Sequence, residues 1–128
     1  MIIAIDGPSA SGKSTTAKGV SKVLSILYID TGAMYRALTY GFVKEMIDLN
    51  NSREIKKYLS NVDINFNSKN EICLNNRSLS LEIRSKNITS KVSFISAISS
   101  VRDKMVKLQR KIAEGKSCIL EGRDIGTV

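Results

Sequence analysis

The segment with the clearest chemistry is the glycine-rich stretch at residues 7–14. Its sequence, Gly7-Pro8-Ser9-Ala10-Ser11-Gly12-Lys13-Ser14, matches the P-loop pattern G-x-x-x-x-G-K-[ST] at every fixed position. Backbone N–H groups of such a loop and the N-terminus of the following helix bind phosphate, because both carry partial positive charge. The Lys13 ammonium would reach the β- and γ-phosphates, and the Ser14 hydroxyl would join a Mg²⁺ shell. The alternative, a glycine-rich turn without a ligand, is disfavoured because an apolar strand precedes the stretch and a helical pattern follows it.

Charged and polar residues also follow two other apolar stretches. Asp30, Tyr35 and Arg36 follow one of them, and Arg123 and Asp124 follow the other. Carboxyl ends of parallel strands share one edge of a sheet, where open sheets bind their ligands. Arginine suits phosphate because its two parallel N–H groups match two oxygens. From position alone two alternatives stay open: Arg36 as a surface arginine, and Arg123 with Asp124 as a structural ion pair.

The elements that position these residues alternate between strand and helix. Apolar runs predict strands at 2–5, 27–30 and 117–121, and the first is expected to be a parallel strand buried on both faces. Helical spacing predicts helices at 13–24, from 32 past 42, at 51–59 and at 100–114. The residues expected on their buried faces are Ala17, Val20, Leu24, Met34, Leu38, Phe42, Val101, Met105, Leu108 and Ile112. This order predicts an α/β domain with a parallel sheet and helices on both faces.

Local signals predict how some of these helices begin and end. Asn51 with Glu54, and Ser100 with Asp103, are spaced as capping boxes, and Gly115 is a suitable helix stop. Residues 62–83 differ, because apolar and polar residues alternate there around turn-forming residues at 68–70 and 75–76. We therefore expect a small antiparallel insert at 62–83 within a domain that covers residues 1–128.

Composition excludes several classes of protein. Histidine is absent, so no mechanism can use a histidine base or ligand, and the two cysteines lack the CxxC spacing of a zinc or redox site. Two such cysteines are typical of reduced thiols in the cytoplasm. No apolar run has the roughly 20 residues of a membrane helix, and the first residues do not form a signal peptide. The net charge of +8 suits a partner rich in phosphate, although a solvated lysine-rich surface would give the same value.

These motifs together resemble the bacterial cytidylate kinase family. The resemblance rests on their order and spacing along residues 5–15, 28–38, 82–84, 101–102, 108–110 and 121–128. It implies a P-loop nucleoside monophosphate kinase fold and phosphoryl transfer from ATP, with Mg²⁺, to CMP or dCMP. The antiparallel insert resembles the enlarged monophosphate-binding region of that family.

The resemblance also implies roles for single residues. The donor phosphates would be bound by Gly7, Pro8, Ser9, Ala10, Ser11, Gly12, Lys13, Ser14 and Thr15. Arg36 and Arg123 would hold the acceptor phosphate and, with Lys13, form the catalytic set. Ser93, Arg102 and Asp124 would contact cytosine, and Asp30 and Tyr35 would line the monophosphate pocket. Without the resemblance, Ser93 would be interpreted as a helix-surface serine and Arg110 as solvent-facing.

A complete member of the family continues beyond the Gly126-Thr127-Val128 motif, with further core strands, an arginine-bearing lid and an adenine-binding loop. The resemblance therefore implies that these 128 residues are an N-terminal part, incomplete at the C-terminus. Kinase activity of the 128 residues alone is then in doubt, and the alternative is a non-catalytic nucleotide-binding fragment. A nucleic-acid-binding P-loop protein is disfavoured, because aromatics are only 5% and no basic run is interleaved with them. We expect a full-length monomer that binds neither nucleic acid nor membrane.

Overall fold

The computed structural model describes residues 2–6, 13–24 and 26–122. Contacts divide the chain into two compact units, residues 1–32 with 109–128 and residues 33–108. The division falls inside two helices, α2 (Thr31–Lys44) and α5 (Ser99–Ala113). Each unit contains one sheet of its own, parallel in the first unit and antiparallel in the second.

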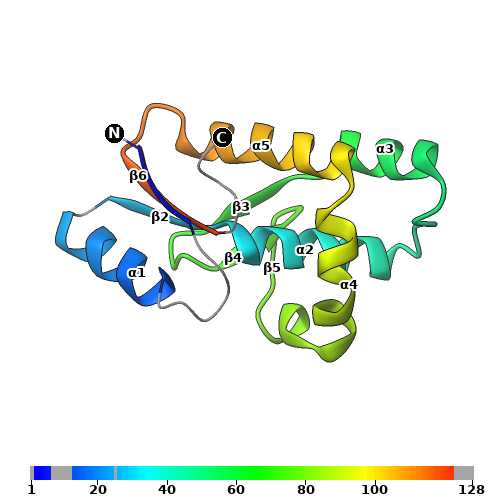
Figure 1. Cartoon of the computed structure of the whole chain (residues 1–128), viewed down its shortest axis with the longest axis horizontal. Helices are drawn as coiled ribbons and strands as arrows, with labels where there is room; N and C mark the ends of the chain where they lie inside the picture. Colours follow the sequence, from blue (N-terminus) through cyan, green and yellow to red (C-terminus); the bar gives the residue numbers. More distant parts are fainter. Residues whose placement is uncertain (1, 7–12, 25, 123–128) are drawn as a thin grey trace. The chain divides into compact units, whose positions relative to one another are not determined.

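The first unit contains the predicted parallel sheet. Its strands are β1 (Ile2–Asp6), β6 (Cys118–Gly122) and β2 (Leu27–Asp30), in the order β1-β6-β2 (Figure 1). Both pairings are parallel. The strands and the α/β fold class predicted from the sequence are thereby confirmed.

Helix α1 (Lys13–Leu24) packs against all three strands of this sheet. The core beneath it consists of buried Tyr28 and Ile119 with the half-buried side chains of Ile3, Ile5, Val20 and Ile26. The bounds of α1 agree with the prediction, but Leu24 is 47% exposed and was wrongly placed on the buried face. Leu24 is the last residue of the helix, so its apolar face ends at Val20.

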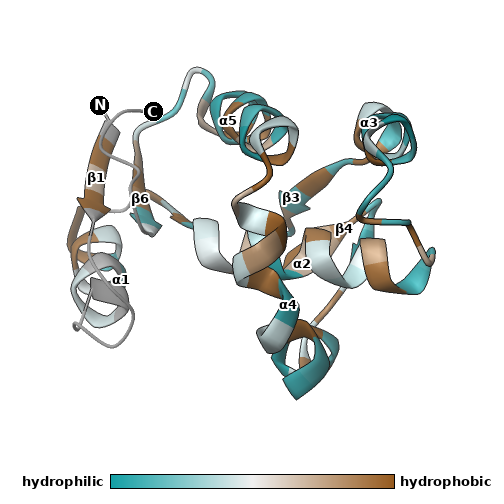
Figure 2. Ribbon diagram, turned by 45° about the vertical axis from the view of Figure 1, so that its right-hand side comes forward, coloured by the Kyte–Doolittle hydropathy of each residue, from teal (hydrophilic) through white to brown (hydrophobic). Residues whose placement is uncertain are grey.

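The prediction that β1 is buried on both faces is wrong. Figure 2 shows β1 largely in the hydrophobic colour, yet Ala4 is exposed and Ile3 and Ile5 are only half-buried. Within the described residues β1 pairs with β6 alone. The central strand β6 has a neighbour on each side and is buried along its length, because burial follows position in the sheet as well as hydropathy.

The second unit contains the small antiparallel sheet. Its strands are β3 (Ile64–Phe66), β4 (Ile72–Leu74) and β5 (Arg77–Ser78). Asn75 and Asn76 connect β4 to β5 with φ angles of 49° and 69°, as a two-residue type I′ hairpin turn requires. The turn predicted at 75–76 is therefore confirmed.

The alternating pattern does not continue as a strand to residue 83. Residues Leu81–Arg84 form a 3₁₀ helix, η1. Leu79 and Ile83 are buried, whereas Leu81 between them is 78% exposed. A strand would place all three side chains on one face, but a helical turn places Leu81 on the opposite side. Period-two spacing over so short a stretch did not distinguish the two structures.

The helices of the second unit follow the predicted periodicity. In α2, Met34, Leu38 and Phe42 are buried, as predicted, although the helix begins at Thr31 and not at residue 32. Helix α3 (Ser52–Asn61) is capped by Asn51, whose Oδ1 accepts from the Glu54 N–H at 3.1 Å. The Glu54 carboxylate accepts instead from the Asp48 N–H, so the second bond of the expected capping box goes to a different residue.

Two helix beginnings were missed or misplaced. No bounds were predicted for helix α4 (Lys86–Ser96), although Ser93 was interpreted as lying on a helix surface; Ser85 caps it by accepting from the Ile88 N–H at 3.3 Å. Helix α5 begins at Ser99, so Ser100 lies inside it and is not its cap. Gly115 follows α5 with φ 67°, which confirms the predicted stop. No helix in the described ranges is long and apolar enough to span a bilayer.

Candidate functional site

The strands of the first unit end level with one another at the carboxyl edge of the sheet. In the ladder Asp6 is opposite Gly122, and Asp30 is opposite Glu121. Residues 7–12 follow β1, residues 123–128 follow β6, and α2 follows β2 without an intervening residue. These three segments carry most of the predicted site residues, and all three begin at one edge of the sheet, where open parallel sheets bind ligands.

The P-loop lies between β1 and α1, as its chemistry requires. Residues 7–12 are outside the described part of the chain, but β1 ends at Asp6 and α1 begins at Lys13. Lys13, Ser14 and Thr15 form the start of α1, and no acidic residue occurs in its first turn. The helix N-terminus therefore keeps its positive potential for a bound phosphate. The strand predicted before the motif and the helix predicted after it are both present.

Two buried polar residues at this edge were missed by sequence analysis. Thr31 is 2% exposed, and its Oγ1 donates to the main-chain carbonyl of Glu121 at 2.8 Å. Glu121 is 3% exposed, although it carries a carboxylate within an otherwise apolar strand. An ionisable residue inside an apolar run was the signal that could have identified Glu121, since burying a charge is costly. For Thr31 the only signal in the sequence was its position between a predicted strand and Gly32.

The second unit brings together two of the predicted substrate residues. Tyr35, in the first turns of α2, interacts electrostatically with Arg102 in the first turn of α5. Burial raises the pKa of the Tyr35 phenol above 10.0, and the positive charge of Arg102 offsets part of that rise. The phenol is therefore neutral near pH 7 and can donate a hydrogen bond. Arg102 itself is exposed, so its guanidinium is accessible to an anionic or carbonyl group.

The remaining predicted residues are placed as follows. Asp30 ends β2, and Arg36 is half-buried on α2. Ser93 is exposed on α4, and its carbonyl accepts from the Ser96 hydroxyl at 3.1 Å. Arg123 and Asp124 lie outside the described residues.

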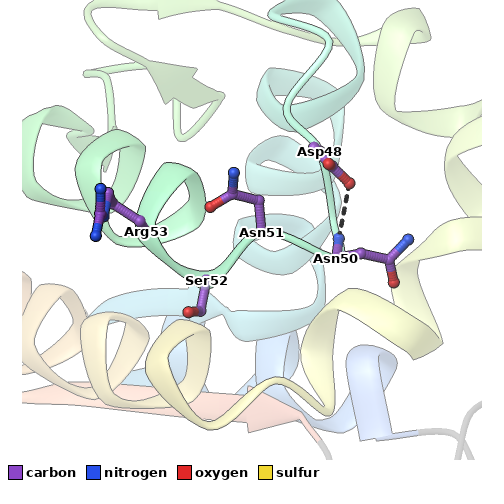
Figure 3. A pocket seen from close by; sticks show the side chains of 5 residues that line it. All are labelled: Asp48, Asn50, Asn51, Ser52 and Arg53. Carbon is purple, nitrogen blue, oxygen red and sulfur yellow. Dashed lines mark hydrogen bonds between the residues drawn. The ribbon is translucent and has the colours of Figure 1, made fainter.

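A polar hollow of about 480 Å³ lies where α2 connects to α3 (Figure 3). It is lined by Asp48, Asn50, Asn51, Ser52 and Arg53. Asp48 Oδ1 accepts from the Asn50 N–H at 2.9 Å, and Asn51 is the cap of α3. These polar groups form the turn and the helix cap, and none of the predicted site residues within the described ranges lines the hollow.

Comparison with known proteins agrees with the motifs. The model of the cytidylate kinase family matches residues 3–128. The chain is 45% identical to the cytidylate kinase of Halalkalibacterium halodurans, with 99% of this chain and 59% of that protein covered. It is 49% identical to the cytidylate kinase of Clostridioides difficile strain 630, with 99% and 58% covered.

A third relative is named as a bifunctional protein. The chain is 50% identical to the bifunctional pantoate ligase/cytidylate kinase of Prochlorococcus marinus subsp. pastoris, with 98% of this chain and 26% of that protein covered. The chain thus spans less than two thirds of the curated relatives that it matches. Since the family match extends over residues 3–128, the chain belongs to the cytidylate kinase family and corresponds to its N-terminal part.

Proposed function

We propose that this chain supplies the P-loop and acceptor-binding residues of an enzyme that transfers a phosphoryl group from ATP to CMP or dCMP. The products are ADP and CDP or dCDP. The observation that carries the proposal is the P-loop motif between β1 and α1 at the carboxyl edge of a parallel sheet, in a chain matched by the cytidylate kinase family over residues 3–128.

Residues 7–15 act on the donor. The loop and the first turn of α1 bind the ATP phosphates through backbone N–H groups, and the Lys13 ammonium neutralises charge at the β- and γ-phosphates. The residues fit a hydrated Mg²⁺, because the Ser14 hydroxyl is an oxygen ligand and such an ion takes its other ligands from water and the nucleotide phosphates. When bound, Mg²⁺ would neutralise the negative charge that the phosphoryl group carries during transfer.

A second set of residues acts on the acceptor. The Arg36 and Arg123 guanidinium groups bind the phosphate of CMP, while Ser93, Arg102 and Asp124 contact cytosine. Asp30 lines the monophosphate pocket, and the neutral Tyr35 phenol donates a hydrogen bond within it. The attacking phosphate oxygen is already anionic near neutral pH, so no general base is needed. Positioning and charge neutralisation are then sufficient, which agrees with the absence of histidine.

A matched pair of lysines on α1 tests the donor site. Lys13 begins the helix, and Lys22 lies exposed in its last turn. We expect Lys13→Ala to weaken ATP binding and to lower any CDP formation by about 100-fold or more, since it removes one preorganised cation. Lys22→Ala should leave both unchanged. The measurements are ATP titration by calorimetry and a coupled assay for CDP; equal effects of the two substitutions would refute the P-loop assignment.

Arg36 tests the acceptor site in the same way. Arg36→Lys keeps the charge but removes the two-pronged hydrogen bond to phosphate, and we expect CMP binding to weaken about tenfold. Arg53→Lys, on the exposed surface of α3, is the control.

The same assays on the unsubstituted chain distinguish the two candidate functions. Binding of both nucleotides with CDP formation supports the kinase. Binding without turnover favours a non-catalytic nucleotide-binding fragment, and binding of neither nucleotide refutes both.

The proposal accounts for the basic charge without nucleic acid or membrane. The +8 charge serves two polyanionic substrates, so we propose a cytoplasmic enzyme that is monomeric when full length. Nucleic-acid binding would show a steep loss of affinity with added salt, which filter binding over a salt series measures. Tight binding with such a slope would contradict this part of the proposal.

A further inference from the structure

The junction between β2 and α2 contains a buried hydroxyl with a partner far away in the sequence. Thr31 is the first residue of α2, is 2% exposed, and donates through Oγ1 to the Glu121 carbonyl at 2.8 Å. The two residues are 90 positions apart. Asp30 and Glu121 form the last pair of the ladder between β2 and β6. Thr31 is the residue after Asp30, so its side-chain bond links the start of α2 to the last paired residue of β6.

A second buried threonine on the same helix bonds differently, so a hydrogen bond to a distant strand is not what every buried threonine of α2 makes. Thr39 is 0% exposed, and its Oγ1 donates to the Tyr35 carbonyl at 2.8 Å within the helix. Such bonding to the preceding turn is the usual choice for a threonine in a helix. Thr31 has no such turn before it, and its hydroxyl holds the start of α2 to the neighbouring strand.

We propose that Thr31 is a positioning residue for acceptor binding, because its hydrogen bond to Glu121 fixes where the helix that carries Arg36 begins. This inference rests on the function proposed above for Arg36. Arg36 lies five residues further along α2, about 1.4 turns, and a helix transmits a shift of its first turn to that position. Small misplacements of binding groups can cost large factors in rate, so a fixed start is valuable.

Three substitutions test the proposal in this chain. Thr31→Val keeps the shape but leaves the Glu121 carbonyl without its hydroxyl donor; Thr31→Ser keeps the donor; Thr39→Val removes an equally buried hydroxyl from the same helix. We expect Thr31→Val to weaken CMP binding about tenfold, which is the result when the start of α2 keeps its binding-competent position only about one tenth of the time. ATP binding should stay within about twofold, because the P-loop is on another segment. Thr31→Ser and Thr39→Val should retain the wild-type ratio of CMP to ATP affinity.

Calorimetry with CMP and with ATP gives the two affinities. Hydrogen exchange at residues 35–38 in the nucleotide-free protein gives a second measurement, because these amides donate to the carbonyls of the first α2 turn. We expect Thr31→Val to speed exchange there, and Thr31→Ser to restore protection. A purely structural role would weaken CMP and ATP binding equally, or make Thr39→Val as damaging as Thr31→Val; either result overturns the inference. Unchanged exchange in free Thr31→Val also overturns it, since the hydroxyl would then act only by touching the nucleotide.

The same experiment separates failure of this inference from failure of the proposed function. A wild-type chain that does not bind CMP refutes the function proposed for Arg36. Hydrogen exchange at residues 35–38 then still decides whether the Thr31 hydroxyl holds the start of the helix.

Discussion

Two glycines inside helices should respond in opposite ways to the same substitution. A Cβ added at Gly41 in α2 would collide with the Tyr58 hydroxyl and would lie 3.1 Å from both Tyr58 Cζ and Leu74 Cδ2. The Tyr58 ring packs on Phe42 with ring centroids 5.0 Å apart, so it cannot move aside freely. A Cβ at Gly19 in α1 would meet nothing within 4 Å.

The magnitudes follow from two opposing effects. Alanine is favoured over glycine in a helix by about 0.8–1 kcal/mol, so Gly19→Ala should raise the free energy of unfolding by about that amount. At Gly41 the same gain is opposed by an overpacking cost of about 1–3 kcal/mol. We therefore expect Gly41→Ala to lower the free energy of unfolding by up to about 2 kcal/mol. For a chain of this length the two variants should differ in Tm by roughly 4–12 °C.

Urea denaturation of both variants measures the difference, and a double-mutant cycle with Tyr58→Phe identifies its cause. Removal of the hydroxyl should reduce the cost of Gly41→Ala by about 1 kcal/mol, since the closest contact disappears. The reasoning is refuted if the two glycine variants shift Tm alike. It is also refuted if Gly41→Ala and Tyr58→Phe add within about 0.3–0.5 kcal/mol.

Three further predictions concern backbone conformation and pH. Met46 has φ 54° at the end of α2, so Met46→Gly should stabilise the protein by about 1 kcal/mol in urea denaturation. Asn76 has φ 69° in the hairpin turn, so Asn76→Ala should destabilise it by about 1 kcal/mol while Asn76→Gly is tolerated. Burial raises the pKa values of Tyr35 and Tyr58 above 10.0, so the unfolded chain ionises first. The contribution of these two tyrosines to the free energy of unfolding is therefore fully present below about pH 10 and is lost as the pH rises further. Urea denaturation over a pH series should show this loss, and a free energy of unfolding that increases above about pH 10 would contradict the prediction.

Much of the first unit could be predicted from sequence because its signals are local. The bounds predicted for α1 and β2 coincide with the structure, since an apolar run and a helical period are properties of neighbouring residues. The P-loop is equally local, because its strand, loop and helix are consecutive. The burial of β1 was predicted wrongly for the opposite reason: it depends on which strand lies beside it, and β6 is more than 100 residues away in the sequence.

In the second unit, prediction from sequence fails where the structure depends on a distant partner. Leu81 belongs to an alternating pattern, but whether that stretch becomes a strand depends on having a partner, and η1 forms instead. The interaction of Tyr35 with Arg102 joins two helices, and nothing near either residue indicates it. Sequence reasoning placed these residues in one site only through the family resemblance, and spacing alone left Arg36 and Ser93 indistinguishable from surface residues.

Buried polar groups explain why the candidate site was harder to predict than the fold. An apolar side chain is stabilised by any apolar neighbour, so its burial can be inferred from its own periodicity. A buried hydroxyl or carboxylate requires one specific partner with the right geometry, and that partner can lie anywhere in the chain. Thr31 illustrates this, because its acceptor on Glu121 is 90 residues away and a threonine before a glycine carries no signal of it. Residues of this kind decide where a helix such as α2 begins, and therefore where the residues that it carries can act.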